Sequence, residues 1–162
     1  MPRERITILD MVDCRSTIAP ALAEGVRFIQ EQVTREDYQR QLARLVGPGD
    51  MIIDLAWNIG CTDMLDWCHR HEVLYVNTSV ELWDPYDNLE HKRTTDRTLY
   101  VRHMAIRQLM RTWGGDPGAT AILEHGANPG LVSHFTKRAL MDIARKILKE
   151  KPRDPRVPRL EQ

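Results

Sequence analysis

The strongest chemical pattern in the sequence is the segment from His125 to Ser133, HGANPGLVS. Its two glycines and its proline predict a turn from a strand into a helix, with Pro129 near the helix start, where a missing N–H group costs nothing. The free N–H groups of a first helical turn favour an anionic or carbonyl-like ligand group. The side-chain amide of Asn128 could bind a ligand at the same place. Taken alone, however, these residues are also ordinary punctuation between a strand and a helix.

A second polar stretch, TSVELW, runs from Thr78 to Trp83 and follows an apolar strand. The Glu81 carboxylate could hold a cationic amine or relay a proton. The ring of Trp83 could offer its face to the same cation. The alternative is that Glu81 is a surface carboxylate and that Trp83 packs on the sheet.

Two more polar residues lie at predicted strand ends: Asp10 ends one strand, and Asn58 follows another. In dinucleotide-binding folds an acidic residue at a strand end accepts hydrogen bonds from ribose hydroxyls, about twenty residues after a glycine-rich turn. The chain has no G-x-G-x-x-G turn, so Asp10 could also be a plain strand-end residue. Asn58 likewise fits ordinary turn chemistry.

Composition excludes several classes of partner. Lys plus Arg and Asp plus Glu both number 23, so the chain has no net basic excess for nucleic acid or a membrane surface. No apolar run approaches the ~20 residues that span a bilayer, and the first residues do not resemble a signal peptide. We therefore expect a cytoplasmic protein. The cysteines do not suggest a disulfide framework or a metal site, and we expect Cys61 and Cys68 to be buried thiols.

Short apolar strands alternate with longer amphipathic helices along the chain. This alternation predicts an α/β fold with a doubly wound parallel sheet, in which ligands bind at the carboxyl ends of the strands. The tail, residues 151–162, has three prolines among charges and is expected to be a linker or a disordered end. The strands are expected at 6–10, 26–29, 51–56, 73–76 and 119–123, and the helices at 34–45, 62–71, 93–113 and after residue 130.

Two segments together resemble the homospermidine synthase family of the saccharopine dehydrogenase-like group. They are HGANPGLVSHF at 125–135, followed by Lys137, Ala139, Leu140 and DIA at 142–144, and LYVNTSVELW at 74–83. The resemblance spans Ile6 to Lys146. It implies that residues 1–150 form an NAD-binding, Rossmann-like domain that is incomplete, because the family's first strand and glycine-rich loop lie upstream of Ile6. It also implies that the family's substrate-binding domain is absent, and that the isolated chain has no synthase activity.

The resemblance further implies a reaction and its residues. NAD is the recycled redox cofactor. An amine of putrescine or spermidine is oxidised to an imine, a second putrescine displaces the amino group to form a Schiff base, and the same NADH reduces this to homospermidine. Glu81 would bind the amine and handle protons, and Asn58 and Asn128 would line the pocket near the nicotinamide. Asp10 would take the ribose, and Thr78 and Pro129 would border the cofactor. Members are commonly homodimers.

Two other functions remain open. A saccharopine or amino-acid dehydrogenase would act on a 2-oxo acid, and its site would favour an arginine that clamps the substrate carboxylate. A non-catalytic, degenerate Rossmann-like remnant would carry no reaction.

Overall fold

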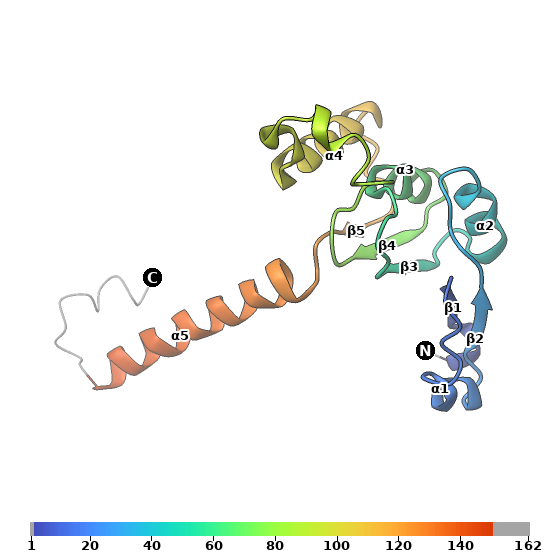
Figure 1. The fold of residues 1–162 in the computed structure, drawn as a ribbon. Coiled ribbons are helices and arrows are strands. Elements are labelled where there is room, and N and C mark those ends of the chain that lie inside the picture. Colours follow the sequence, from blue (N-terminus) through green and yellow to red (C-terminus); the bar gives the residue numbers. More distant parts are fainter. Residues whose placement is uncertain (1, 151–162) are drawn as a thin grey trace. The chain divides into compact units, whose positions relative to one another are not determined.

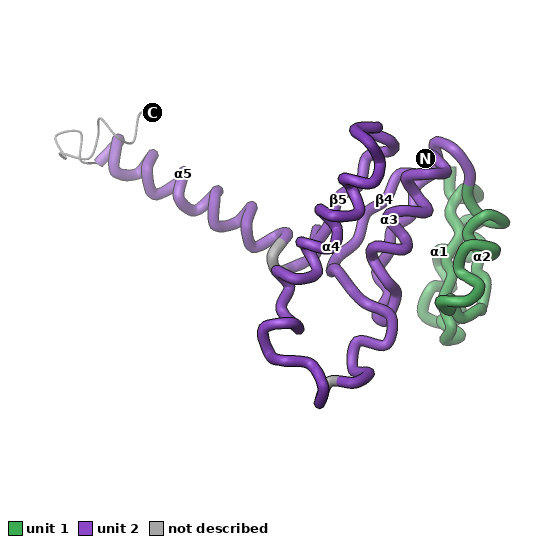
Figure 2. The backbone as a smooth tube through the Cα atoms, turned by 90° about the horizontal axis from the view of Figure 1, so that it is seen from above, with its two compact units in different colours: residues 1–46 green, residues 47–162 purple. Residues whose placement is uncertain are grey.

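The computed structural model describes residues 2–150 of the 162-residue chain (Figure 1). The chain forms two compact units, residues 1–46 and residues 47–162 (Figure 2), which we call unit 1 and unit 2. Each unit contains a small sheet whose strands are all parallel, so the predicted α/β class is confirmed. The tail predicted at 151–162 lies outside the described residues.

Unit 1 is built on a two-stranded sheet. Strand β1 (Thr7–Asp10) pairs with β2 (Arg27–Gln30), and the two strand-end residues Asp10 and Gln30 lie opposite each other. A turn, η1 (Arg3–Arg5), precedes the sheet, and the short helix α1 (Ala19–Ala23) connects its strands. This connection returns the chain to the same end of the sheet, as parallel pairing requires.

Helix α2 (Tyr38–Leu45) completes unit 1 and buries Leu42. Its first turn is organised by Thr34, whose backbone N–H and hydroxyl both donate to the Asp37 carboxylate, at 3.1 and 2.8 Å. These bonds, led by the one from the hydroxyl, hold the pKa of Asp37 below its usual value. The sequence placed the helix start at Thr34. The hydrogen-bonded turn does begin there, but the regular helix begins at Tyr38.

Unit 2 is built on the three-stranded parallel sheet β3-β4-β5. Helix α3 connects β3 to β4, and helix α4 connects β4 to β5, as in a repeated β-α-β arrangement. The side chains of Tyr75 and Asn77 on β4 are buried on the face that α3 covers. The elements are β3 (Met51–Asp54), α3 (Cys61–Arg70), β4 (Leu74–Asn77), η2 (Leu89–His91), η3 (Thr94–Arg97), α4 (Leu99–Thr112), β5 (Ala121–Ile122), η4 (Ala127–Leu131) and α5 (Val132–Glu150).

Helices α3 and α4 pack through aromatic contacts. The His69 ring of α3 stacks on Trp113 at the end of α4, with the ring centroids 3.9 Å apart. The Trp113 indole N–H also donates to Asp66 of α3 at 3.2 Å. The C-terminal end of α4 is therefore anchored to α3, and its N-terminal half is left to meet the loops at the other end of the sheet.

The opposite face of the unit 2 sheet is apolar and partly exposed. Residues of odd number on β3 point away from α3, and Ile53 is 63% exposed. Its partner in register on β4 is Val76, which in turn lies opposite Ile122 of β5, another exposed residue. Among the described residues, no strand pairs with the outer edge of β3.

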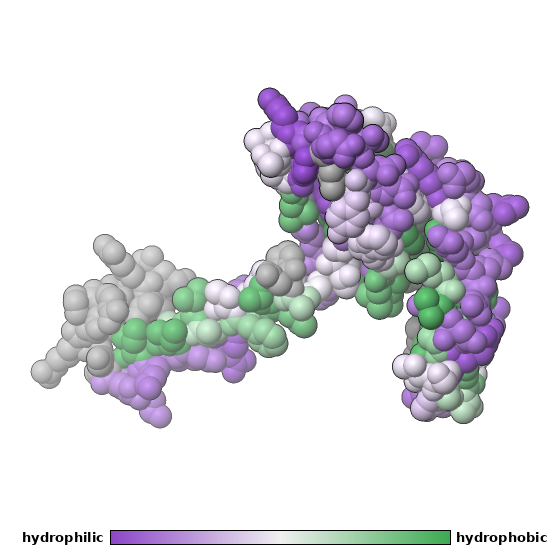
Figure 3. Space-filling model, viewed as in Figure 1, coloured by the Kyte–Doolittle hydropathy of each residue, from purple (hydrophilic) through white to green (hydrophobic). Residues whose placement is uncertain are grey.

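Helix α5 has an exposed apolar stripe of its own. Figure 3 shows hydrophobic side chains along one side of this helix and hydrophilic side chains along the other. Phe135, Leu140 and Ile143 of this helix are all more than half exposed. None of the helices within residues 2–150 has both the length and the apolar content to cross a membrane.

The predicted elements are present, with further differences in detail besides the later start of α2. The helix predicted from residue 93 begins at Leu99, because residues 94–97 form the separate turn η3. The strand predicted at 119–123 is reduced to Ala121–Ile122, since only these residues pair with β4. Helix α1 was not predicted, because its five residues are too few to display a helical period.

Candidate functional site

A buried asparagine organises the carboxyl end of β4. Asn77 is 1% exposed, and its side-chain oxygen accepts a hydrogen bond from the backbone N–H of Glu124, just after β5, at 2.8 Å. Its side-chain nitrogen donates to Cys61 Sγ at 3.3 Å and to the Tyr75 hydroxyl at 3.4 Å. Its backbone carbonyl accepts from His125 N at 2.9 Å. One side chain thus links β4, the start of α3 and the loop after β5.

Burial keeps two groups of the same cluster, the Tyr75 hydroxyl and the Cys61 thiol, in their neutral forms. The Tyr75 hydroxyl donates to Asp54 Oδ2 at 2.6 Å, and burial, together with the nearby Asp54 carboxylate, raises the pKa of Tyr75. Burial raises the pKa of the Cys61 thiol to about 12, so Cys61 is a neutral packing group rather than a nucleophile at neutral pH. Among the described residues, no group of three His, Cys, Asp or Glu side chains could hold a metal ion.

The loop after β4 contacts both the loop after β3 and the N-terminus of α3. Asn58, which has a positive φ of 64°, accepts the backbone N–H of Asp84 on its side-chain oxygen at 2.5 Å. The N–H of Cys61, at the start of α3, donates to the Glu81 carbonyl at 3.1 Å. The Trp83 indole N–H donates to Asp63 at 2.6 Å, and its ring lies so close to Gly60 that a Cβ there would overlap it. The Trp83 ring therefore packs on the N-terminus of α3.

The loops after β4 and β5 also meet directly. A Cβ on Gly126 would lie 2.9 Å from the Thr78 carbonyl oxygen, so only glycine allows this approach. Glu124 has a positive φ of 57° and is held there by its bond to Asn77. Strained backbone of this kind persists where the surroundings over-determine it, and it is common at functional sites.

Two carboxylates at this edge are paired with basic side chains of α4. Glu81 Oε2 lies 3.7 Å from Arg102 Nη1, which also donates to the Val80 carbonyl at 2.6 Å. Glu124 Oε2 lies 2.8 Å from His103 Nε2. The Glu81 and Glu124 side chains are 20% and 14% exposed, so both are partly accessible from solvent.

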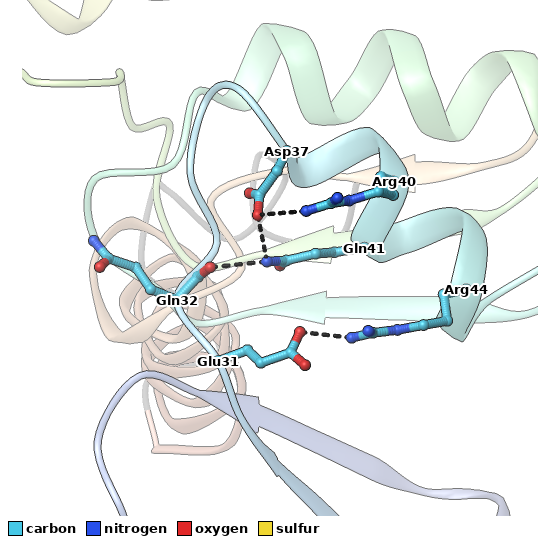
Figure 4. Close-up of a pocket in the computed structure, with 6 residues that line it drawn as sticks. All are labelled: Glu31, Gln32, Asp37, Arg40, Gln41 and Arg44. Carbon is cyan, nitrogen blue, oxygen red and sulfur yellow. Dashed lines mark hydrogen bonds and ion pairs between the residues drawn. The ribbon is translucent and has the colours of Figure 1, made fainter.

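Unit 1 has its own polar groups at the carboxyl ends of its strands. Asp10 is exposed, and its Oδ1 accepts the Val12 N–H at 2.8 Å, as in a strand-end turn. A pocket of about 530 Å³ lies beyond the end of β2 (Figure 4), where Gln41 donates to the Gln32 carbonyl and to Asp37, both at 2.9 Å. Its charged groups are already paired with one another, so we place the candidate site in unit 2. The pocket is lined by Glu31, Gln32, Asp37, Arg40, Gln41 and Arg44.

The structure brings three of the predicted site residues into one network of loops. Asn58, Thr78 and Glu81 lie in the connected loops of unit 2, whereas Asp10 belongs to unit 1. The backbone of Asn128 and Pro129 forms part of η4, and their side chains lie outside the described residues.

Sequence reasoning missed several members of the cluster. Asp54 and Asn77 are polar residues that close apolar strands and lie opposite each other in register, so the strand-end rule that selected Asp10 could have found them. Arg102 and His103 carry no such signal. They lie inside a helix, and only the folded chain places them against the loops.

Comparisons with known proteins match most of the chain to one group of proteins. A family model described as the saccharopine dehydrogenase NADP binding domain matches residues 2–122. The homospermidine synthase of Blastochloris viridis is 32% identical over 145 residues, which cover 88% of this chain and 30% of that protein. The homospermidine synthase of Mesorhizobium japonicum is 34% identical over 146 residues, which cover 88% of this chain and 29% of that protein.

A solved structure supports the same relationship. The crystal structure of the homospermidine synthase from Legionella pneumophila in complex with NAD matches with a TM-score of 0.70 and 29% identity. The match covers 90% of this chain and 28% of that one. The chain therefore spans about 30% of the length of the curated relatives that it matches.

Proposed function

Because the chain belongs to the family of saccharopine dehydrogenase NADP-binding domains, we propose that it is the nucleotide-binding part of an NAD-dependent homospermidine synthase. The observation that carries the proposal is the set of polar loops at the carboxyl edge of β3-β4-β5, with the Glu81 carboxylate among them. In open α/β sheets this edge is where ligands bind. The names of the relatives and the NAD in the Legionella pneumophila structure support the same assignment.

The residues at these strand ends have the chemistry that a dinucleotide requires. In unit 1, the exposed Asp10 carboxylate, whose Oδ1 accepts the Val12 N–H, would also accept hydrogen bonds from ribose hydroxyls. In unit 2, Asn58 and Asn128 would line the pocket near the nicotinamide, and Thr78 and Pro129 would border the cofactor. NAD, when bound, would accept a hydride and return it at the end of the cycle.

Glu81 would bind the substrate amine. A diammonium substrate such as putrescine needs a carboxylate to hold it, and its reacting nitrogen must lose a proton before the adjacent carbon can give up a hydride. Glu81 is partly exposed at the ligand edge, and its backbone is held by Cys61. It would therefore hold the ammonium group and accept that proton. Polyamine substrates, a homodimer and a cytoplasmic location all belong to this proposal.

The contacts of Arg102 help to distinguish the synthase from the alternative function, a dehydrogenase of 2-oxo acids. A dehydrogenase of 2-oxo acids would use an arginine to clamp the substrate carboxylate, and Arg102 is beside Glu81. Its guanidinium, however, is bound to the Val80 carbonyl and faces Glu81. Comparing the whole protein on putrescine and on lysine plus 2-oxoglutarate would separate the two reactions.

The substitution Glu81→Gln tests the proposed role. In the whole protein it should lower kcat for homospermidine formation about 100-fold or more, because it removes the proton acceptor and the negative charge. The NAD dissociation constant, measured by calorimetry, should stay within about twofold of the original value. The matched control is Glu90→Gln, an exposed residue of η2. Equal losses of turnover and NAD affinity would contradict the assignment.

The 162 residues by themselves are expected to show no polyamine-dependent formation of NADH. They span about 30% of the relatives' length, and their NAD binding is expected to be weak. Absorbance at the NADH band, with putrescine and NAD added to the purified chain, measures NADH formation, and calorimetry measures NAD binding. Steady turnover, or stoichiometric tight NAD binding, would overturn the expectation.

A further inference from the structure

Two consecutive basic residues of α4 bind two different loops of the candidate site. Arg102 contacts the loop after β4, and His103 contacts the loop after β5. The partners of Arg102 and His103 are 22 and 21 residues away in sequence. The N-terminal half of α4 therefore sets how these two loops lie against each other.

Arg102 has the more specific arrangement of the two. Its Nη1 donates to the Val80 carbonyl at 2.6 Å and lies 3.7 Å from Glu81 Oε2. On the other side of the same loop, the Glu81 carbonyl accepts the Cys61 N–H at 3.1 Å. The backbone that carries the Glu81 carboxylate is thus held both by α4 and by α3.

We propose that Arg102 is a positioning residue, which acts by holding Glu81 in place. The proposal rests on the proposed function, in which Glu81 binds the substrate amine. A guanidinium has five N–H donors in a fixed plane, so it can bind a carbonyl and face a carboxylate at once. When a group that positions the substrate is displaced by about 1 Å, the reaction rate can fall about 100-fold. The neighbouring His103 contacts the Glu124 carboxylate at 2.8 Å.

The first test uses the 162-residue chain and needs no activity. The indole N–H of Trp83, two residues after Glu81, is bonded to Asp63, and the indole N–H of Trp113 is bonded to Asp66. In Arg102→Met, NMR should show hydrogen exchange at the Trp83 indole accelerated about tenfold, because local opening of the loop becomes easier. The Trp113 indole should exchange within about twofold of its original rate. Arg107→Met, on the exposed side of the same helix, is the matched control.

Two outcomes would overturn the proposal at this stage. An unchanged Trp83 rate in Arg102→Met would mean that Arg102 does not hold the loop. Equal acceleration at Trp83 and Trp113 would mean that Arg102 only stabilises the unit as a whole.

The second test is a double-mutant cycle in the whole protein. Arg102→Met should lower kcat about 10- to 100-fold at unchanged NAD affinity, and Arg102→Lys should recover part of the loss. In the Glu81→Gln background, Arg102→Met should cost less than about a further twofold, because both changes then act on the same interaction. Additive losses would overturn the proposal. If the unmodified protein has no activity on diamines, the proposed function fails, and the exchange experiment alone decides whether Arg102 positions the loop.

Discussion

At the scale of single residues, Asn77 connects three parts of the candidate site. Its amide binds groups from β4, from α3 and from the loop after β5. Buried polar groups are tolerated when every bond is made, and they are costly when one is lost. Asn77 therefore fixes the left-handed backbone of Glu124, and through it the start of the segment that leads to η4.

Replacing this side chain by an apolar one of similar size should be strongly destabilising. Asn77→Leu leaves the Glu124 N–H without an acceptor, and the free energy of unfolding should fall by about 2–3 kcal/mol. Urea unfolding followed by tryptophan fluorescence measures the loss. Gln108→Leu, at an exposed position of α4, is the control and should change stability by less than about 0.5 kcal/mol. A similar small effect for Asn77→Leu would show that the network does not bear on stability.

At the scale of elements, α3 ends in a common geometry but with an unfavourable residue at one position. The N–H of Val73 bonds to the Cys68 carbonyl at 3.0 Å and the N–H of Glu72 bonds to the His69 carbonyl at 3.4 Å. This is the helix ending in which glycine is preferred at the left-handed position. That position is occupied by Glu72, which has a φ of 55°, whereas α1 has Gly25 at the equivalent place. Helix α3 thus ends against the conformational preference of its own residue.

The substitution Glu72→Gly should therefore stabilise the protein. The gain should be about 0.5–1 kcal/mol, because glycine adopts the positive φ without the steric cost of a Cβ. Thermal unfolding gives the measurement as a rise in Tm. Glu72→Ala is the control, since it removes the same charge but keeps the Cβ, and it should give no gain. A lower Tm for the glycine variant would mean that the Glu72 side chain makes a stabilising contribution of its own.

At the scale of the whole molecule, the chain combines two units with much exposed apolar surface. Unit 1 has a two-stranded sheet, and a small unit buries a smaller fraction of its surface than a large one. In unit 2, one face of the sheet and one side of α5 carry exposed residues such as Ile53 and Phe135. Contiguous exposed apolar surface is typical of sites that contact other protein.

The two units should unfold separately. Trp57, Trp67, Trp83 and Trp113 are all in unit 2, so tryptophan fluorescence reports on that unit alone, whereas far-ultraviolet circular dichroism reports on both. Because unit 1 is the smaller, loss of dichroism should begin at a lower urea concentration than the change in fluorescence. Coincident transitions would show instead that the chain unfolds as one cooperative structure.

The sequence by itself determined the α/β class and most of the strands and helices. It also placed Asp10 at a strand end and Asn58, Thr78 and Glu81 in the segments that follow strands. These depend on local signals, because the period of apolar residues and the turn-forming residues are read along the chain. Helix starts were less accurate, as at α4, which begins at Leu99 because residues 94–97 form the separate turn η3.

Only the tertiary structure decided which of those residues share a network and what holds them. It connected Asn58 to Asp84 and Thr78 to Gly126, and it assigned Asp10 to unit 1. It also placed Arg102 and His103 against loops more than twenty residues away in sequence. Such contacts leave no periodic trace in the sequence, since they depend on how helices and strands pack after they form.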